Sequence, residues 1–301
     1  FEENPFIQSH QRAIVIEVWD SGFTAIDEKF NFETIQWDDS YSWAREFIDE
    51  NRRGKVPKGF MDLLDVGDLV YLSAENDQVK LDQIPQAQSS LISFNPKTGE
   101  VLSYVGGSVF NDSQFDRVRQ SYPQSGSVFK PFIYASAFSG GYNPSSLIND
   151  APIIFEDENL ETFWRPENYS GKFYGLTTLR EALVQSINIV SIKLLREIGI
   201  KKSSETIDNF GFGTERLPQD LSLALGSGNF SPAEVARGFS VFANGGMISD
   251  IHYVSQIKDK NGDIIFDHSE IDVVNVSSIS AFPWLNTCLL YTSDAADDAG
   301  S

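Results

Sequence analysis

Apolar and polar residues alternate in short runs over the first 85 residues, with acidic, Asn- and Gly-containing turns between the runs. The clearest runs are residues 13–19 and 67–72, and their length and their Val, Ile and aromatic content are typical of strands. Residues 41–48 have a mixed pattern that predicts one or two helical turns. Several short strands in so short a segment predict a small all-β barrel or sandwich.

The pattern changes near residues 83–86, and two further apolar runs follow at residues 90–94 and 100–107. Between these runs lies the sequence Asn-Pro-Lys-Thr-Gly of residues 95–99. Two apolar runs around a Pro- and Gly-containing turn predict a β-hairpin. We therefore expect a first domain over residues 1–85 and a second domain that opens with this hairpin.

A helical pattern begins near residue 127. Residues 129–138 repeat apolar side chains at helical spacing and end at a Gly-Gly pair. Pro131 has no amide hydrogen and is tolerated only in a first turn, so the helix is expected to start close to Ser127.

Further helices are predicted from cap signals. Thr178 and Ser231 are each followed three positions later by Glu, the pattern of a capping box. Residues 254–266 form two strand-like runs around Asn-Gly and predict a hairpin. Strands, then a helical block, then strands again predict an α+β domain.

Composition and charge narrow the possible functions. The chain has 301 residues, 41% of them hydrophobic and 22% charged, which is a globular composition with room for about two domains. Its formal net charge of -20 disfavours a nucleic-acid partner or an anionic membrane surface. No stretch approaches the ~20 consecutive apolar residues of a membrane span. We expect either a soluble protein or an anchor outside this chain.

No metal or cofactor is expected from the residue types present. The single cysteine, Cys288, excludes a disulfide framework, and His10, His252 and His268 have no metal-ligand spacing. A Ser-His-Asp arrangement stays open, although nothing marks one of these histidines as its base.

Residues 287–301 look like translated sequencing-adapter DNA, and we exclude them as a non-native tail.

Ser127 and Lys130 are the first candidates for chemistry. Side chains three apart on a helix lie about 5–6 Å apart at Cβ, so the lysine amine can reach the serine hydroxyl. A serine becomes a useful nucleophile only beside a base, and a lysine serves as base only when its pKa is lowered. The spacing alone is a weak signal. A second copy, Ser255 and Lys258, lies in a strand-like run where the two side chains point to opposite faces, and we interpret it as incidental.

Four segments carry a resemblance to a known family. They are residues 124–132 (Gln-Ser-Gly-Ser-Val-Phe-Lys-Pro-Phe), 149–152 (Asn-Asp-Ala-Pro), 164–169 (Trp-Arg-Pro-Glu-Asn-Tyr) and 180–188 (Arg-Glu-Ala-Leu-Val-Gln-Ser-Ile-Asn). Together they resemble the transpeptidase domain of class A penicillin-binding proteins, most closely the bifunctional 1A type of Gram-negative bacteria. The resemblance implies a penicillin-binding/β-lactamase-like transpeptidase domain over residues 86–286, preceded by a small OB-like domain.

The family's signature has three parts: Ser-x-x-Lys, Ser-x-Asn and Lys-Thr-Gly. Ser127 and Lys130 match the first part, and Ser186 and Asn188 match the second. A rival Ser-x-Asn at residues 227–229 lies in a Gly-rich turn without a preceding helix, so we rank it far behind.

The third part is not found where the family has it. Lys97-Thr98-Gly99 has its letters but lies upstream of Ser127, in the turn of the opening hairpin, where turn chemistry explains it. After Asn188 no Lys-Thr-Gly or Lys-Ser-Gly follows. We therefore expect that the domain is truncated before its third motif and that the polypeptide itself is inactive.

The resemblance implies acyl transfer. Ser127, with Lys130 as base, would attack the carbonyl of a D-Ala-D-Ala stem peptide, and Ser186 would relay a proton to the leaving D-alanine. Asn188 would hold the substrate's amide and orient the lysine, and the loop at Gly126 would also contact substrate, beside an oxyanion donor at the Ser127 amide. The acyl group would pass to an amine of a neighbouring stem, and β-lactams would acylate the same serine.

The resemblance also implies a context. We expect the periplasmic face of a bacterial inner membrane, with a glycosyltransferase domain and a single-pass anchor outside this chain. Two alternatives are a serine β-lactamase-like hydrolase, although the chain lacks the Glu-x-x-Leu-Asn element of class A members, and a non-catalytic cell-wall-binding homologue.

Overall fold

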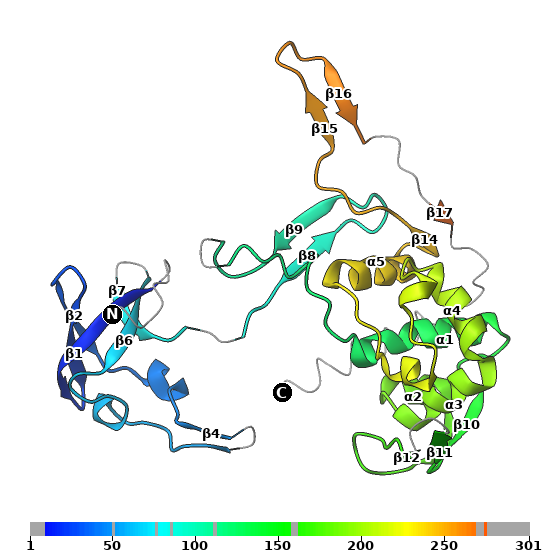
Figure 1. Ribbon diagram of the computed structural model, residues 1–301, viewed down its shortest axis with the longest axis horizontal. Helices are drawn as coiled ribbons and strands as arrows, with labels where there is room; N and C mark the ends of the chain where they lie inside the picture. The colour runs from blue at the N-terminus through cyan, green and yellow to red at the C-terminus, as the bar shows by residue number, and fades with distance from the viewer. Residues whose placement is uncertain are drawn as a thin grey trace. The chain divides into compact units, whose positions relative to one another are not determined.

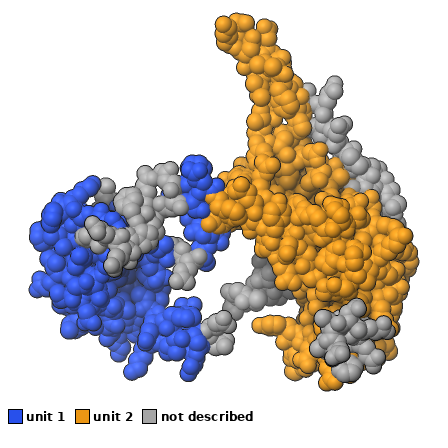
Figure 2. All heavy atoms as spheres, viewed as in Figure 1, with its two compact units in different colours: residues 1–89, 107–114 blue, residues 90–106, 115–301 orange. Residues whose placement is uncertain are grey.

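The structure, a computed structural model, describes residues 10–49, 52–75, 78–84, 87–110, 113–157, 162–268 and 274–275 (Figure 1). The chain divides into two compact units. The first comprises residues 1–89 and 107–114, and the second comprises residues 90–106 and 115–301 (Figure 2). The predicted non-native tail at residues 287–301 lies outside the described residues.

The first unit is built on one antiparallel sheet of five strands in the order β3-β2-β1-β6-β7. The edge strands β3 and β7 contact each other, so the sheet curls around its core. This arrangement confirms the small all-β domain expected from the alternating pattern. The strands are β1 (Gln11–Trp19), β2 (Gly22–Asp27), β3 (Phe32–Gln36), β6 (Leu69–Glu75) and β7 (Gln78–Asp82).

The core of this unit is centred on Phe60, which begins the short 3₁₀ helix η2 (Phe60–Asp62) and is fully buried. Its ring lies 4.7 Å from that of Phe23, 5.1 Å from that of Trp37 and 5.0 Å from that of Tyr41, measured between centroids. Edge-to-face and tilted contacts at these distances are favourable beyond the apolar area that they bury. The aromatic rings therefore pack together in the core of this unit.

The helical turn predicted at residues 41–48 is only partly right. A 3₁₀ helix, η1 (Asp39–Trp43), begins where the Asp38 side chain accepts a hydrogen bond from the Ser40 amide. The later residues instead form strand β4 (Phe47–Asp49), which pairs with β5 (Arg52–Arg53). Pairing across this hairpin takes the backbone groups that a helix would have used.

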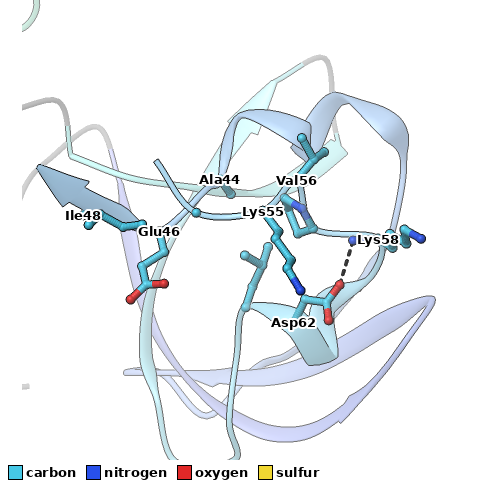
Figure 3. Close-up of a pocket in the computed structure, with 10 residues that line it drawn as sticks. Ala44, Glu46, Ile48, Lys55, Val56, Lys58 and Asp62 are labelled. Atoms are coloured by element: carbon cyan, nitrogen blue, oxygen red, sulfur yellow. Dashed lines mark hydrogen bonds between the residues drawn. The ribbon is translucent and has the colours of Figure 1, made fainter. Parts of the chain in front are cut away.

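A pocket of about 590 Å³ lies beside that hairpin (Figure 3). The backbone amide of Lys58 donates a hydrogen bond of 2.8 Å to a carboxylate oxygen of Asp62 within it. None of the motifs singled out in the sequence lies here. The lining residues are Ala44, Glu46, Ile48, Gly54, Lys55, Val56, Pro57, Lys58, Asp62 and Leu63.

The second unit opens with the predicted hairpin, β8 (Leu91–Phe94) and β9 (Val101–Val105), and continues through η3 (Gly126–Phe129) into helix α1 (Lys130–Ser139). Its other strands in the described residues form short pairs: β10 (Leu147–Asp150) with β13 (Gly175–Thr178), β11 (Phe155–Asp157) with β12 (Thr162–Trp164), β14 (Met247–Ile248) with β17 (Val274–Asn275), and β15 (Gln256–Lys258) with β16 (Ile264–Asp267). The remaining helices are α2 (Leu179–Val184), α3 (Asn188–Ile198), α4 (Ile200–Asp208), η4 (Thr214–Arg216), η5 (Leu221–Leu225) and α5 (Pro232–Ala243).

Helix α1 is the centre of this unit and contacts α2, α3 and α4 (Figure 1). All its residues except Ser139 are buried, so it is enclosed on every side, which explains its nearly continuous apolar sequence. The rings of Phe129, Phe132 and Phe212 meet at centroid distances between 4.8 and 5.2 Å beside its first turn. The start of α1, where the candidate serine and lysine lie, is therefore held by a dense aromatic core.

The helices predicted from cap signals are present, and two others were not foreseen. Thr178 caps α2, and Ser231 forms a complete capping box with Glu234 at the start of α5. The predictions did not include α3 or α4. None of the helices within the described residues is both long and apolar enough to cross a bilayer.

Candidate active site

Ser127 and Lys130 lie where the 3₁₀ turn η3 passes into α1. The predicted helix therefore starts with a tighter turn, in which residues three apart lie directly above one another. The Lys130 amide donates to the Ser127 carbonyl, which closes this turn. Ser127 is exposed, whereas Lys130 is 1% exposed. The arrangement presents the serine to solvent and holds the lysine beneath the surface.

The Lys130 ammonium is the meeting point of the two predicted motifs. Its Nζ donates to the Ser186 carbonyl at 2.7 Å, to Ser186 Oγ at 3.0 Å and to Asn188 Oδ1 at 2.8 Å. These three acceptors match the three hydrogens of an ammonium. Among the hydrogen bonds of the described residues, none joins Nζ to the Ser127 hydroxyl. Burial lowers the pKa of Lys130 to about 8, which brings the neutral amine within reach near physiological pH.

Ser186 occupies a backbone conformation that is rare for a residue with a side chain. Its φ is 52°, and it lies between the end of α2 and the start of α3. The turn is held by hydrogen bonds from the Ser186 amide to the Leu183 carbonyl and from the Ile187 amide to the Ala182 carbonyl. Such strain costs on the order of 1–3 kcal/mol and gathers at functional sites. Here it aims both the carbonyl and the hydroxyl of one residue at Lys130.

Asn188 is the first residue of α3, and its side-chain amide is engaged at both ends. Oδ1 accepts from Lys130, and Nδ2 donates to the Glu167 carbonyl at 3.0 Å. The two partners assign the amide orientation, because a carbonyl only accepts and an ammonium only donates. Glu167 belongs to the Trp-Arg-Pro-Glu-Asn-Tyr segment, and sequence reasoning gave it no role.

The rival motif at residues 227–229 lies against the loop that carries Ser127. The Ser125 amide donates to the Gly228 carbonyl at 3.0 Å, and the Gly126 amide donates to the Gly226 carbonyl at 2.9 Å. A Cβ on Gly226 would lie 1.9 Å from the Gly126 carbonyl oxygen, so only glycine allows this approach. The Gly-rich segment therefore supports the loop that carries the candidate nucleophile, a role that the sequence analysis did not predict.

The other two decoys lie in ordinary structural positions. Lys97-Thr98-Gly99 forms the turn between β8 and β9, where the Ser249 hydroxyl donates to the Lys97 carbonyl at 3.0 Å. A Cβ on Gly99 would lie 1.9 Å from the Asp250 carbonyl oxygen, so close packing accounts for this glycine. Ser255 precedes β15 and Lys258 ends it, in an exposed hairpin.

A serine at the start of a buried helix, a buried lysine of lowered pKa and a Ser-x-Asn turn are the arrangement of the penicillin-recognising serine acyltransferases. The chain belongs to the penicillin-binding protein transpeptidase family. The family described as "Penicillin binding protein transpeptidase domain" matches residues 90–282, and the "Penicillin-binding protein OB-like domain" matches residues 2–87. The fold class and the family expected from the sequence are both confirmed.

Relatives named penicillin-binding protein 1A are similar over most of this chain. The protein of Pseudomonas aeruginosa is 41% identical over 255 residues, which is 84% of this chain and 31% of the relative. That of Escherichia coli K12 is 37% identical over 225 residues, 75% of this chain and 26% of the relative. The chain therefore spans about a third or less of the curated relatives that it matches.

A solved structure has the same fold over both units. The crystal structure of penicillin-binding protein 1A from Haemophilus influenzae matches with a TM-score of 0.73 and 30% identity, covering 91% of this chain and 38% of that one. A D,D-transpeptidase domain from Eggerthella lenta matches with a TM-score of 0.58 at 18% identity, which supports the fold alone.

Proposed function

We propose that this chain carries the acyl-transfer site of a penicillin-sensitive peptidoglycan D,D-transpeptidase. The observation that carries the proposal is the buried Lys130 ammonium, bonded to Ser186 and Asn188 beneath an exposed Ser127. The relatives named penicillin-binding protein 1A support it. A Mycobacterium tuberculosis protein solved as a penicillin G acyl-enzyme complex shares the fold at a TM-score of 0.59 and 18% identity, and this likeness concerns the fold alone.

The proposed reaction begins at Ser127. Its Oγ forms a bond to the carbonyl carbon of the donor's penultimate D-alanine while Lys130, as neutral amine, takes its proton. The peptide C–N bond then breaks as Ser186 relays to the departing D-alanine nitrogen the proton that Lys130 took from Ser127. With a pKa of about 8, roughly a tenth of Lys130 is neutral at pH 7, against well under a thousandth for an unshifted lysine.

The acyl group then passes from Ser127 to an amine of a neighbouring stem peptide, which gives the cross-link and frees the serine. Asn188 holds the donor's backbone amide, and Gly126 lies at the loop that contacts substrate. The Ser127 amide is one oxyanion donor. A β-lactam enters by the same first step, since its ring carbonyl takes the place of the peptide carbonyl.

The second oxyanion donor is proposed to come from the third motif, which does not occur between Asn188 and residue 286. Loss of one such donor costs ~10²–10³ in rate. We therefore propose that the 301-residue chain by itself reacts with penicillin slower by that factor, or not measurably. We also propose that the protein acts at the outer face of the cytoplasmic membrane, in company with a glycosyltransferase domain.

Fluorescent-penicillin labelling tests the function. The chain is compared with a chimera in which the segment after residue 286 is replaced by the C-terminal part of the transpeptidase domain of the P. aeruginosa relative. The chimera is expected to label stably and its Ser127→Ala variant to stay unlabelled, while the chain labels ~10²–10³ slower. Robust labelling of the unmodified chain, lost in its own Ser127→Ala variant, would refute its proposed inactivity.

Two other outcomes would favour the alternatives. Label that is gained and lost within minutes indicates rapid deacylation and a β-lactamase-like hydrolase. A folded chimera that takes no label at any penicillin concentration indicates a non-catalytic, wall-binding homologue.

A further inference from the structure

The first turn of α3 lacks a cap of its own. Its N-cap residue is Ile187, which has no polar side chain to accept the free amides of the helix start. Asn168, which is twenty residues upstream of Asn188, takes this place. Its Oδ1 accepts from the Asn188 amide at 3.0 Å and from the Ile189 amide at 3.1 Å. The backbone of Asn188 is therefore set by a residue outside its own helix.

Asn168 is itself held in one orientation. Its Nδ2 lies 3.0 Å from each carboxylate oxygen of Asp150 and 2.8 Å from the Lys172 carbonyl oxygen. Because an ionised carboxylate only accepts hydrogen bonds, the amide cannot be reversed without losing these contacts. Asp150 is 1% exposed and Asn168 is 6% exposed, so the loss of one partner leaves the other buried without water to replace the hydrogen bond, which is costly.

Asp150 is anchored in turn. One of its oxygens accepts from the Tyr174 amide at 2.9 Å, just before β13 begins beside β10. The chain of contacts thus runs from the β10–β13 pair through Asp150 and Asn168 to the first residue of α3. Glu167, the residue before Asn168, provides the carbonyl that accepts a hydrogen bond from Asn188 Nδ2. One short loop therefore holds both the backbone and the side chain of Asn188.

We infer that Asn168 is a positioning residue for the proposed acyl-transfer site: with Asp150 as its anchor, it fixes Asn188 so that Oδ1 faces the Lys130 ammonium. This inference rests on the proposed function, because the orientation that Asn168 gives to Asn188 matters for acyl transfer only if Lys130 is the base of that reaction. Asn168 acts through Asn188 and does not contact Lys130 in the hydrogen bonds of the described residues.

The test reads the site without requiring turnover. Lysine labelled with ¹³C at Cε reports the titration of Lys130 in the 301-residue chain, and Lys130→Arg assigns the signal. In Asn168→Ala the backbone amide of Asn188 loses its acceptor, so the Asn188 side chain is no longer fixed beside the Lys130 ammonium. The titration midpoint of Lys130 is therefore expected to fall by about one pH unit. Asn188→Ala sets the full size of the effect, and Asn168→Ala should reproduce most of it.

Asn244→Ala is the matched control. Asn244 is also 6% exposed and donates its Nδ2 to a carbonyl, that of Met247, but it lies at the end of α5. Its loss is expected to lower stability and leave the Lys130 titration unchanged. Equal midpoints in the folded Asn168→Ala and Asn244→Ala variants would overturn the inference.

A polarity swap keeps the test decisive if Asn168→Ala fails to fold. Asn168→Asp sets two carboxylates against each other, and the Asn188 side-chain amide resonances should move and broaden. Adding Asp150→Asn restores a donor to the pair, while Asp at position 168 still accepts from the α3 amides. The double variant should recover the native Asn188 resonances and a higher melting temperature than Asn168→Asp alone.

Resonances that stay native in the single variant, or that the double variant fails to restore, contradict the inference. These signals do not depend on acylation. A chimera that never labels would contradict the proposed function and leave the positioning role of Asn168 unaffected. A chimera that labels, together with unchanged Asn188 resonances in Asn168→Asp, would support the function and contradict the positioning role.

Discussion

The Nζ atom of Lys130 lies 2.8 Å from Oδ1 of Asn188, although the two residues are 58 positions apart in the sequence. This contact joins the first residue of α1 to the first residue of α3, with the strained turn at Ser186 beside them. A buried ammonium thus holds two helix starts together, and its removal is expected to affect both the chemistry and the local packing.

Acylation of the chimera is expected to depend on pH through Lys130. Burial lowers the pKa of Lys130 to about 8, so the neutral base becomes more abundant as pH rises through that value. The second-order rate constant for penicillin should therefore increase about tenfold per pH unit below pH 8 and level off above it. Stopped-flow or gel-based labelling across this range measures the profile.

Lys130→Arg supplies the control for that profile. Arginine keeps the positive charge but does not deprotonate in this range, so acylation should fall by at least ~10³ at every pH. A wild-type rate that does not change between pH 6 and pH 9 would argue against lysine as the base.

Gly226→Ala is expected to displace the loop that carries Ser127, although residue 226 lies in a different segment that packs against it. The new Cβ would lie 1.9 Å from the Gly126 carbonyl oxygen, at a residue whose φ is 72°. Gly245→Ala is the matched control, because Gly245 has a φ of 62° with open space around the Cβ position. The control should cost about 1 kcal/mol in urea unfolding and spare acylation, whereas Gly226→Ala should cost at least ~2 kcal/mol more and slow acylation tenfold or more.

Glu234 is expected to make stability depend on acidity. Burial raises its pKa, but hydrogen bonds from Arg216 and Ser231 outweigh burial and leave the pKa below its usual value. A depressed carboxyl pKa stabilises the fold above the unfolded-state value, and this contribution is lost as pH falls through the folded-state value. Glu234→Gln should therefore cost about 1 kcal/mol at neutral pH and little at about pH 3. Equal differences at both pH values in urea unfolding would contradict this origin.

Lys97 is expected to be dispensable for acylation despite the Lys-Thr-Gly letters around it. Its carbonyl accepts from Ser249, and a backbone contact of this kind does not need the lysine side chain. Lys97→Ala should label within twofold of the parent chimera. Gly99→Ala should instead unfold more easily, because its Cβ would lie 1.9 Å from the Asp250 carbonyl oxygen. A tenfold loss of labelling in a well-folded Lys97→Ala chimera would restore the motif as a candidate.

The sequence was informative wherever a local rule determined the structure. The Ser231 capping box, the hairpin around residues 95–99 and the placement of Pro131 at the start of α1 each depend on neighbouring residues only. Residues 47–49 departed from the prediction because their strand pairs with residues 52–53, and such pairing is not written into local propensity.

The candidate site was predicted in its parts but not in its geometry. Ser186 and Asn188 were found by their match to a family pattern, while their contacts with Lys130 cross 56 and 58 residues. The sequence did not identify Asn168, because its role depends on two features of the folded chain. One is that helix α3 has Ile187 at its N-cap position and so starts without a polar cap, and the other is that the partner of Asn168, Asp150, is buried.

The location of the penicilloyl group tests the central claim most directly. The chimera is reacted with penicillin, digested, and mapped by mass spectrometry to the modified residue. The account predicts a single adduct on Ser127, reduced by at least ~10³ in rate in Lys130→Arg. An adduct on Ser186 or Ser227, or one that survives Ser127→Ala, would contradict it.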